Sequence, residues 1–323
     1  MDWALGLVSL LVFPGFALMI ALSFLYEWYD RKLYAGIQMR RGPLYTGPMG
    51  ILQPFADFVK LMSKEDLTPR HADRRVFNSV PVIMVALMLT ALMMIPVTGA
   101  SGLISFSGDI IFAIVAMTFF CILVFLAGFS SMSRYSVIGA ERAVLQLLGF
   151  EIPLMLSMVG VCIFSGAVTI SGIVAQQYGL WNLIGPQLLS FAIFLIAAQA
   201  ELERVPFDIP EAEQEIVAGW LTEYSGRKLA LIRLARNLEL IFIAGLAAAL
   251  YLGGPLGPST DALAPFLFPI YFIAKTLFVV LLLAFMKSIF ARVRIDQMVS
   301  FAWRYLIPLS LVQIMITLIW RAL

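Results

Sequence analysis

Eight long apolar runs constrain the fold of this chain more than any other feature of its sequence. Each run is close to the roughly 20 residues that an α-helix needs to cross a bilayer. Hydrophobic residues make up 61% of the chain and charged residues 13%, whereas soluble domains carry about 25% charged residues, so a soluble globule is excluded. We predict an all-α polytopic membrane protein, a single domain over residues 1–323, with about eight transmembrane helices at 3–26, 76–97, 109–130, 142–165, 185–203, 229–252, 265–287 and 299–320.

Lysine and arginine are concentrated in alternate loops. The side that follows the first helix carries nearly all of them, and only Arg321 is assigned to loops of the opposite side. Because cytoplasmic loops of membrane proteins are enriched in these residues, we expect both termini to be external and the large loops 27–75 and 203–228 to be cytoplasmic, in the cell membrane. The N-terminus lacks a basic region before its apolar run and a clear cleavage site, which indicates a retained first helix.

The first large loop contains an amphipathic segment. It opens with a turn-rich strip, Arg40-Arg-Gly-Pro-Leu-Tyr-Thr-Gly-Pro48. Apolar residues then recur at helical spacing between residues 51 and 62, and the opposite face carries Gln53, Asp57, Lys60 and Lys64. This pattern predicts a cytoplasmic amphipathic helix. It could lie in the membrane surface or pack against a partner; the basic turn favours a partner, and these residues alone leave both open.

The stretch from residue 199 to 226 is the most acidic part of the chain. With a single base, Arg204, it holds seven of the twenty acidic residues: Glu201, Glu203, Asp208, Glu211, Glu213, Glu215 and Glu223. Pro206 and Pro210 interrupt any helix running through it, and Asp208 followed by Glu211 is typical of an N-cap with a capping box. We therefore predict a helix end, a kinked turn and a short acidic loop helix that places Glu211 and Glu215 on one face.

Helix-dipole effects explain only part of this acidity. Acids in the first helical turn complement the positive end of the dipole, which accounts for Asp208 and Glu211. Glu201 and Glu203 instead lie at the end of an apolar run, where unpaired carboxylates are costly and usually functional. So many like charges repel one another unless protons, cations or a basic partner relieve them. We expect this loop to be a functional site.

Three further charges fall inside predicted spans: Glu151, Glu239 and Lys275. An isolated charge at the bilayer centre costs about 2.5 to 3.5 kcal/mol on insertion scales, so these residues predict a polar file in the interior. Because burial and neighbouring charges both shift ionisation equilibria, such a file could exchange protons near neutral pH. Arg236 and Glu239, three apart on one helix, favour a static ion pair, whereas Glu151 and Lys275 favour a functional role.

Ligands for redox centres are scarce. Cys121 and Cys162 lie in apolar runs without CxxC spacing, which favours buried reduced thiols over a disulfide or a metal site. His71 is the only histidine. Haem, iron–sulfur and zinc sites each need several Cys or His ligands at close spacing. We predict that this chain has no metal site, no catalytic residue and no redox centre of its own.

Several motifs follow one another along nearly the whole chain: Gly42-Pro43, Gly47-Pro48, Leu52-Gln-Pro-Phe-Ala-Asp57, Lys60, Lys64-Glu-Asp66, Ser133-Arg-Tyr135, Phe150-Glu-Ile152, Pro206-Phe-Asp-Ile-Pro-Glu-Ala-Glu213, Thr222-Glu-Tyr-Ser-Gly226, Arg294-Ile-Asp-Gln297, Trp303 and Leu306-Ile-Pro308. Together they resemble the ND1/NuoH family, the eight-helix membrane subunit of respiratory complex I and of related membrane-bound hydrogenases. The acidic loop and its Thr-Glu-Tyr-Ser-Gly ending are highly specific.

The resemblance implies a membrane anchor for a peripheral electron-transfer arm, placed between that arm and antiporter-like subunits. It also implies that interior acids start a polar path that couples redox energy to ion translocation. With the intramembrane charges above, the residues assigned to this path and to the loop facing the arm are Glu151, Glu201, Glu203, Asp208, Glu211, Glu213, Glu215, Glu223, Glu239 and Lys275. The residues assigned to docking of the arm are Arg40, Arg41, Gly42, Pro43, Asp57 and Lys60.

The partners implied are peripheral subunits, either NuoB/NuoD-like or hydrogenase small and large subunits, together with small membrane subunits, antiporter-like subunits and the lipid bilayer. Nucleic acid is not among them. Iron–sulfur clusters, and a nickel–iron centre in the hydrogenase form, are expected in those partner subunits and no cofactor in this chain. Protons or sodium ions would be the transported species.

Two departures distinguish this chain from quinone-reducing members. Leu44 replaces the Asn of their Arg-x-Gly-Pro-Asn-x-x-Gly-Pro motif, and Arg236 stands where their sixth helix carries the Glu of Ala-Glu-Tyr. With Gly226-Arg-Lys-Leu-Ala-Leu231, this looks closer to the ferredoxin-linked hydrogenase branch, which uses no quinone, and fits its sulfane-sulfur-reducing relatives equally. We predict the membrane-anchor and coupling subunit of a hydrogenase-type complex. The alternatives are the quinone-binding subunit of a complex I-like oxidoreductase and the equivalent subunit of a sulfur reductase.

Two other classes of function compete with this one. A self-contained secondary transporter usually shows two halves with matching broken helices, and the long basic loop and short acidic loop show no such repeat. A passive scaffold would carry the same buried charges as structural ion pairs only. Substitution of Glu201 or Glu151 by Gln distinguishes a scaffold from a coupling subunit.

Overall fold

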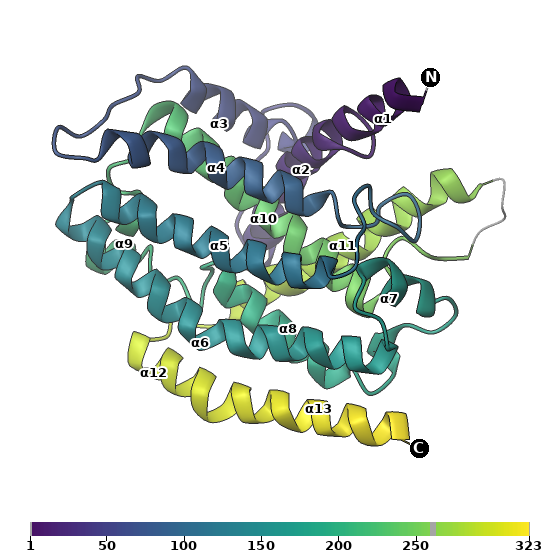
Figure 1. Ribbon diagram of the computed structural model, residues 1–323. Coiled ribbons are helices and arrows are strands. Elements are labelled where there is room, and N and C mark those ends of the chain that lie inside the picture. Colours follow the sequence, from purple (N-terminus) through teal and green to yellow (C-terminus); the bar gives the residue numbers. More distant parts are fainter. Residues whose placement is uncertain (1, 259–262, 323) are drawn as a thin grey trace.

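The computed structural model describes residues 2–258 and 263–322, which form helices and turns without a strand (Figure 1). The long helices are α1 (Asp2–Leu11), α2 (Phe16–Ile37), α4 (Arg74–Leu92), α5 (Asp109–Ser130), α6 (Arg134–Ser165), α8 (Leu188–Glu201), α10 (Gly226–Tyr251), α11 (Ala264–Ile289) and α13 (Ile307–Ala322). The short elements are η1 (Pro48–Gly50), α3 (Gln53–Met62), α7 (Ile170–Gln176), η2 (Asn182–Ile184), α9 (Glu213–Ile216), η3 (Gly219–Leu221), α12 (Ile295–Phe301) and η4 (Ala302–Leu306). The predicted all-α fold is confirmed.

The chain is a multi-pass membrane protein. Within the described residues, six helical stretches are long and apolar enough to cross a membrane: Val8–Ile37, Arg74–Leu92, Asp109–Ser130, Arg134–Ser165, Ala264–Ile289 and Ile295–Ala322. The fifth and sixth predicted runs hold α8, which has 14 residues, and α10, which has 26. Every apolar run found in the sequence therefore coincides with a helix.

The limits predicted for the first helix, 3–26, are wrong. Proline has no backbone N–H and glycine weakens a helix, so Pro14 and Gly15 separate α1 from α2. α2 then continues without interruption to Ile37. Asp30, which the sequence assigned to the first large loop, consequently lies on a helix.

The predicted amphipathic helix is present as α3. The Phe58 ring packs on Phe24 of α2 with centroids 5.6 Å apart, and Leu61 is buried. α3 thus covers α2 and α10 with one edge. A second apolar edge remains uncovered, since Phe55 and Val59 are 51% and 48% exposed.

The short acidic helix begins later than predicted. Asp208 is not its N-cap, because α9 covers only Glu213–Ile216. A residue that precedes proline avoids helical backbone angles, so the chain just before Pro210 does not start a helix. Glu211 lies in a turn, and the helical face that we expected it to share with Glu215 does not form.

α10 is the central helix of the molecule. Every residue from Leu238 to Tyr251 is buried, and α10 packs against α2, α4 and α11. A helix that is apolar on all sides needs neighbours all round, which explains this position. Figure 1 shows α4, α5, α6 and α13 side by side in that order, and α4 is the member of this row that packs most closely on α10.

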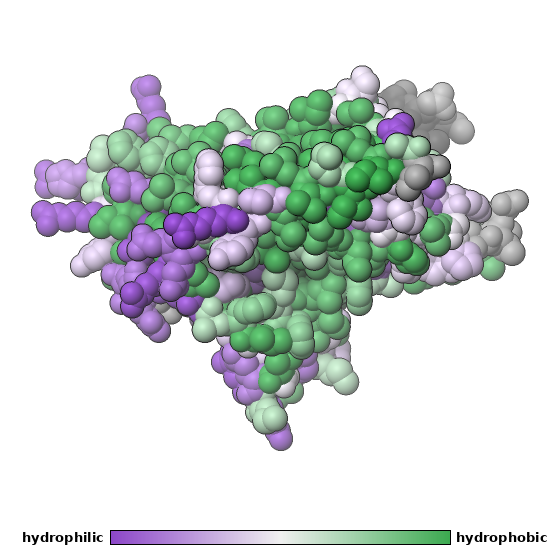
Figure 2. Space-filling view, turned by 90° about the horizontal axis from the view of Figure 1, so that it is seen from below, coloured by the Kyte–Doolittle hydropathy of each residue, from purple (hydrophilic) through white to green (hydrophobic). Residues whose placement is uncertain are grey.

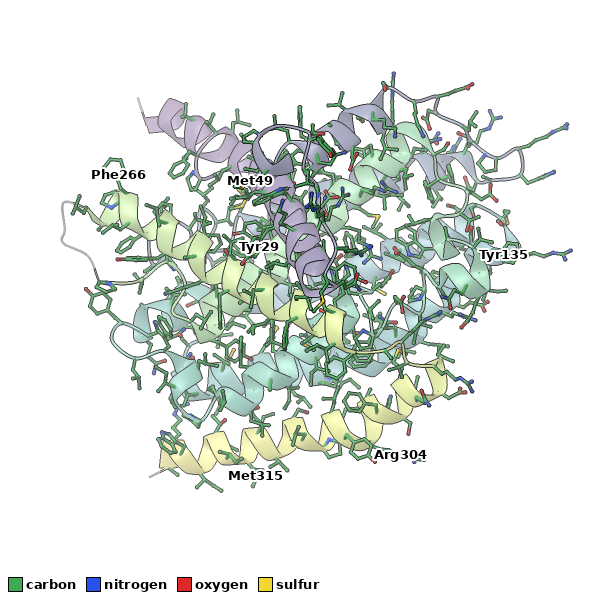
Figure 3. The ribbon with its side chains drawn as sticks, turned by 180° about the vertical axis from the view of Figure 1, so that it is seen from behind. Tyr29, Met49, Tyr135, Phe266, Arg304 and Met315 are labelled. Atoms are coloured by element: carbon green, nitrogen blue, oxygen red, sulfur yellow. The ribbon has the colours of Figure 1, made fainter. Side chains whose placement is uncertain are left out.

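Polar residues gather most strongly at one end of the molecule. Figure 2 shows hydrophilic residues concentrated there and hydrophobic residues over much of the remaining face in view. Figure 3 places Tyr135, near the start of α6, at one end and Phe266, near the start of α11, at the other. α9 and the loop between α3 and α4 lie at the same end as the start of α6 (Figure 1). Parts of both large loops therefore lie at one end of the molecule.

Candidate functional site

Arg236 of α10 is the centre of a buried ion cluster. Its guanidinium group forms an ion pair with Glu203, which follows α8, and a second pair, 3.2 Å long, with Glu239 one turn further along α10. The side chains of Glu203 and Glu239 are 6% and 1% exposed. Removing one member of such a cluster leaves an uncompensated buried charge, which costs about 3 to 5 kcal/mol. The three groups thus hold the start of the acidic loop against α10.

Two aromatic rings enclose the Arg236 guanidinium. Its carbon lies 5.3 Å from the centre of the Trp220 ring and 5.5 Å from that of Phe120, within the range of cation–π attraction. The Trp220 indole N–H also donates to Glu203 across 3.1 Å. Gly139 of α6 leaves room for this tryptophan, since a Cβ atom there would come within 2.6 Å of the Trp220 backbone nitrogen. The loop is therefore packed on α5 and α6 as well.

The backbone at Glu203 is strained. Its φ angle of 48° lies in the left-handed region, which costs a residue other than glycine about 1 to 2 kcal/mol. Such conformations persist only where the surrounding structure holds them, and they cluster at functional sites. Here the next residue, Arg204, lies 3.1 Å from Asp30 of α2. The ion pair of Glu203 with Arg236 and that of Arg204 with Asp30 together hold the strained turn in place.

Glu201 and Glu151 lie beside the cluster. Glu201 ends α8, and the charges of Glu239, Glu151 and Glu203 all act on it. Glu151 of α6 is hydrogen-bonded to the Thr118 hydroxyl of α5. The structure thus brings four of the predicted site residues together inside the molecule, at the level where α8 ends.

Glu211 connects this cluster to the outer part of the acidic loop. Burial, reinforced by the charges of Glu203 and Asp208, raises the pKa of Glu211 to about 7, although Arg236 acts in the opposite direction. A carboxyl group with such a pKa is populated in both protonation states near neutral pH. Glu211 can therefore take up or release a proton without a large change of conditions.

The outer acids of the loop pair with arginines of other elements. Arg292, which follows α11, lies 3.1 Å from Asp208 and 3.6 Å from Glu215, and Arg142 of α6 lies 2.5 Å from Glu215. The hydrogen bond from Arg142 lowers the pKa of Glu215, so this carboxylate stays ionised. The acidic loop is thereby fastened to α6 and to the segment before α12.

Comparison with known proteins places this arrangement in a family. The family described as NADH dehydrogenase matches residues 8–318. The chain belongs to the ND1/NuoH family. It is 37% identical over 315 residues to an NADH-quinone oxidoreductase subunit of Dehalococcoides mccartyi, and the match covers 98% of this chain and 86% of the relative. The corresponding protein of Thermomicrobium roseum is also 37% identical, over 98% of this chain and 97% of the relative. That of Brevibacillus brevis is 37% identical over 90% and 86%.

A second buried ion cluster of this ND1/NuoH-family chain is not predicted by the sequence reasoning. Asp30 of α2, with a side chain 7% exposed, lies 3.1 Å from Arg204 and 3.4 Å from Lys287 of α11. The available signal is the lack of proline between residues 16 and 37, which allows the first helix to extend past Asp30. The cluster joins the acidic loop to α2 and α11.

Asp57, one of the predicted docking residues, belongs to a network of hydrogen bonds and ion pairs between α3, α2 and α10. It lies 2.7 Å from Arg31 of α2 and accepts from Gln53 across 2.9 Å. Although burial acts in the opposite direction, these hydrogen bonds lower the pKa of Asp57. Arg31 also pairs with Glu27, which accepts from Asn237 of α10 across 2.5 Å. This network connects α3 to α2 and α10.

The other predicted docking residues lie at or near the surface: Arg40, Arg41 and Lys60 are exposed, and Gly42 and Pro43 are half-buried. The Pro43 carbonyl accepts a hydrogen bond from Lys32 of α2 across 3.1 Å. This bond holds the turn after α2 against the helix. Arg40 and Arg41, which belong to this turn, are therefore presented at the surface from an ordered backbone.

The two large loops meet at Lys228, at the start of α10. Its Nζ lies 3.2 Å from the Asp66 carboxylate and 2.6 Å from the Thr68 hydroxyl. Nearby, the rings of Phe77 and Tyr224 stack with centroids 4.1 Å apart. The end of the first loop and the end of the acidic loop are therefore held together as one surface.

Two further predicted site residues, Lys275 and Glu223, belong neither to the interior cluster nor to the outer ion pairs that the structure describes. Lys275 of α11 donates to the carbonyl oxygens of Gly254 and Leu256 at 2.9 and 2.7 Å. These carbonyls lie beyond the far end of α10, roughly 18 Å along the helix from Glu239 at 1.5 Å per residue. Glu223 is half-buried before α10, and the side chain of Glu213 lies outside the described residues.

The chain's ligand-type side chains are dispersed. Over the described residues, no group of three or more His, Cys, Asp or Glu is arranged to hold a metal ion. Cys121 and Cys162 are free thiols; Cys121 is buried, as predicted, whereas Cys162 is only half-buried. The carboxylates of the interior cluster can exchange protons, and Arg236 can redistribute charge between Glu203 and Glu239.

Proposed function

We propose that this chain is the membrane-anchor and coupling subunit of an ion-translocating oxidoreductase complex. The surface formed by loops 27–75 and 203–228 would dock a peripheral redox arm, whose subunits would hold the iron–sulfur clusters. The interior acids would pass the response of the arm to antiporter-like neighbours. The Arg236 cluster is the observation that carries this proposal, because it joins the base of the acidic loop to charges inside the apolar layer.

The cluster can act by moving charge over a short distance. Two unit charges 4 Å apart interact by about 4 kcal/mol at an effective dielectric constant of about 20, which exceeds the roughly 1 to 3 kcal/mol of a typical coupling between sites. Electron transfer in the arm would change the charge near Glu211 and with it the protonation of this residue. Arg236 would then redistribute between Glu203 and Glu239. Glu201, which feels the charges of both acids, would respond by exchanging a proton.

Two kinds of electron acceptor suit this proposal. The relatives are named as subunits of NADH-quinone oxidoreductase, which favours a quinone. Arg236 and Leu44 favour a ferredoxin-linked hydrogenase-type or sulfur-reducing complex, because quinone-reducing members resemble a pattern with a carboxylate and an asparagine there. The cavity between α2, α3 and α10, lined by Phe24 and Asn237 among others, has a volume of about 20 Å³. It has room for one water molecule, so a quinone could bind there only if these helices moved apart.

The sidedness of the chain is part of the proposal. We place the docking surface in the cytoplasm, and both termini outside the cell membrane, because the basic residues of the loops gather on the docking side. Whether protons or sodium ions move, the acids of the cluster are the groups that would bind them.

Glu201→Gln and Glu151→Gln test the coupling role. Each variant keeps the size of the side chain and removes its charge, so we expect vesicles containing the complex to lose most of their ion gradient. Electron transfer to a soluble acceptor should stay close to that of the wild type. Glu141→Gln, at an exposed position of α6 outside both large loops, is the matched control. Unchanged gradients in both interior variants would rule out the proposed role.

A second measurement separates the two kinds of acceptor. Quinone-dependent turnover that a quinone-site inhibitor blocks would establish the quinone form. Co-purification of a large subunit that binds nickel and iron would establish the hydrogenase form. The coupling role of Glu201 is shared by both outcomes.

A further inference from the structure

A groove between α6 and α12 leads from the polar end of the molecule into the apolar layer. Two adjoining cavities of about 380 and 410 Å³ form it, and they share Ile295 and Asp296. The first cavity lies beside the acidic loop and is lined by three arginines, Arg142, Arg292 and Arg294. The second is lined mainly by apolar side chains, Leu145, Val299 and Trp303.

The arginine end retains unused hydrogen-bond donors. A guanidinium group has five N–H donors, of which the ion pairs with Glu215 and Asp208 engage Nη1 of Arg142 and Nε and Nη1 of Arg292. Arg294 lines the same cavity and makes no ion pair with any residue that the structure describes. The remaining N–H donors of Arg142, Arg292 and Arg294 are therefore available to bind the oxygens of an anion.

The described acids near the arginine end of the groove are either paired with arginine or exposed. Glu215 is bound by two arginines and Asp208 by one. Asp296 is exposed in the first turn of α12. Among the side chains that the structure describes, three cations face three acids, so attraction depends on the directed N–H donors and not on a large net charge. Phosphate oxygens match guanidinium donors in a bidentate geometry.

The other end of the groove is open and apolar. Leu145 and Trp303 are 44% and 54% exposed, so this cavity is a trough on the outside of the helices. Arg304 follows Trp303 in η4 and is exposed as well (Figure 3). The trough lies along the start of Ile295–Ala322, a stretch that is long and apolar enough to cross a membrane, and Arg292 and Arg294 precede that stretch. The apolar wall therefore belongs to the membrane-crossing part of the chain, and the arginines lie at its edge.

We propose that this groove binds an anionic phospholipid, with its phosphate at Arg142, Arg292 and Arg294 and one acyl chain along Leu145 and Val299. A soluble phosphate would use only the first cavity, and an uncharged lipid only the second. A phospholipid can occupy both cavities at once, with its charged phosphate in the first and an apolar acyl chain in the second. Since Arg292 also holds Asp208, the bound lipid would brace the acidic loop from outside.

Lipid binding can be measured on the intact complex. The complex is depleted of lipid in detergent and titrated with vesicle-derived phosphatidylglycerol or with phosphatidylcholine, while its thermal unfolding midpoint and the retained lipid are recorded. We expect phosphatidylglycerol to stabilise the wild type at lower concentration than phosphatidylcholine. Arg294→Gln should need about tenfold more phosphatidylglycerol, equivalent to about 1.4 kcal/mol. Arg134→Gln, at the exposed start of α6 and outside the groove, should behave as the wild type.

A second variant tests the acyl-chain end. Val299→Trp fills the trough and leaves the arginines intact, so it should reduce retention of both lipids. The proposal fails if the two lipids act alike on the wild type, or if Arg294→Gln and Val299→Trp both respond as the wild type does. It also fails if a photoreactive group attached to Val299→Cys cross-links to a protein subunit and not to lipid. None of these readouts measures ion transport, so the outcome is independent of the proposed function.

Discussion

Glu203 and Arg204 are neighbours in the chain, yet their side chains bind different helices: Glu203 pairs with Arg236 of α10, and Arg204 with Asp30 of α2. The left-handed backbone of Glu203 lies at this branch point. The start of the acidic loop is therefore held at two points by adjacent residues. A displacement of either pair moves the peptide unit that joins them and so reaches the other helix.

The first prediction concerns the central cation. Arg236→Gln leaves Glu203 and Glu239 without their shared partner, and we expect a loss of about 3 to 5 kcal/mol in the free energy of unfolding. Adding Glu203→Gln should restore part of this loss because fewer buried charges remain unpaired. Unfolding of the purified complex measures both. Strict additivity of the two substitutions would contradict a direct pair, and Arg227→Gln, exposed at the start of α10, serves as the control.

The second prediction concerns pH. The pKa of Glu211 in the folded protein, about 7, lies above its ordinary value of 4.5, so the folded state binds this proton more tightly than the unfolded state does. The resulting stability is fully present below about pH 4.5 and is lost as the pH rises through about 7. Glu211→Gln cannot titrate and should flatten this part of the pH profile. Unfolding midpoints between about pH 5 and about pH 8 test it, and parallel curves for wild type and variant would show that Glu211 does not contribute.

The third prediction concerns the cluster on α2. Asp30→Asn removes the counter-charge shared by Arg204 and Lys287, so the start of the acidic loop should open more often. Hydrogen exchange of the backbone amides between residues 202 and 212 should accelerate. Asp66→Asn is the matched control, because Asp66 is 39% exposed and such a pair contributes only about 0 to 1 kcal/mol. Equal exchange rates in the two variants would argue against the anchoring role of Asp30.

The fourth prediction separates stability from coupling. Lys275→Met leaves the carbonyls of Gly254 and Leu256 without their donor, which we expect to cost about 1 to 3 kcal/mol each where these groups are buried. Because Lys275 lies apart from the interior acids, the ratio of ions moved to electrons transferred should remain that of the wild type. A fall in this ratio similar to that of Glu201→Gln would instead assign Lys275 to the ion path.

The sequence predicts those features that depend on local spacing. Run length locates the helices, and a separation of three residues predicts the Arg236–Glu239 pair. The pairing of Asp30 with Arg204 depends on how α2 and the acidic loop pack, which spacing along the chain does not encode. Asp208 does not cap a helix because Pro210 disfavours helical backbone angles at Ile209, the residue with which that helix would begin.

The sequence predicts which acidic residues belong to the site, but it does not predict which side chains they pair with. The density of acids between residues 199 and 226 singles out the loop, and the motifs along the chain lead to the family. The sequence assigned Lys275 to the same interior polar file as Glu151 and Glu239 because each lies in an apolar run, and an apolar run does not report which buried groups face one another. The structure shows that Lys275 serves the carbonyls beyond α10.

The enclosure of α10 on all sides has a consequence for biosynthesis. Two of its permanent neighbours, α2 and α4, precede it in the chain, whereas α11 follows it. Newly made α10 therefore enters the bilayer with one flank still touching lipid. It carries Arg236 and Glu239 inward as a pair of opposite charges on one turn, which lowers the cost of that transfer. Synthesis of α11 then completes the enclosure, so a chain cut short before residue 264 would leave its innermost helix on the outside.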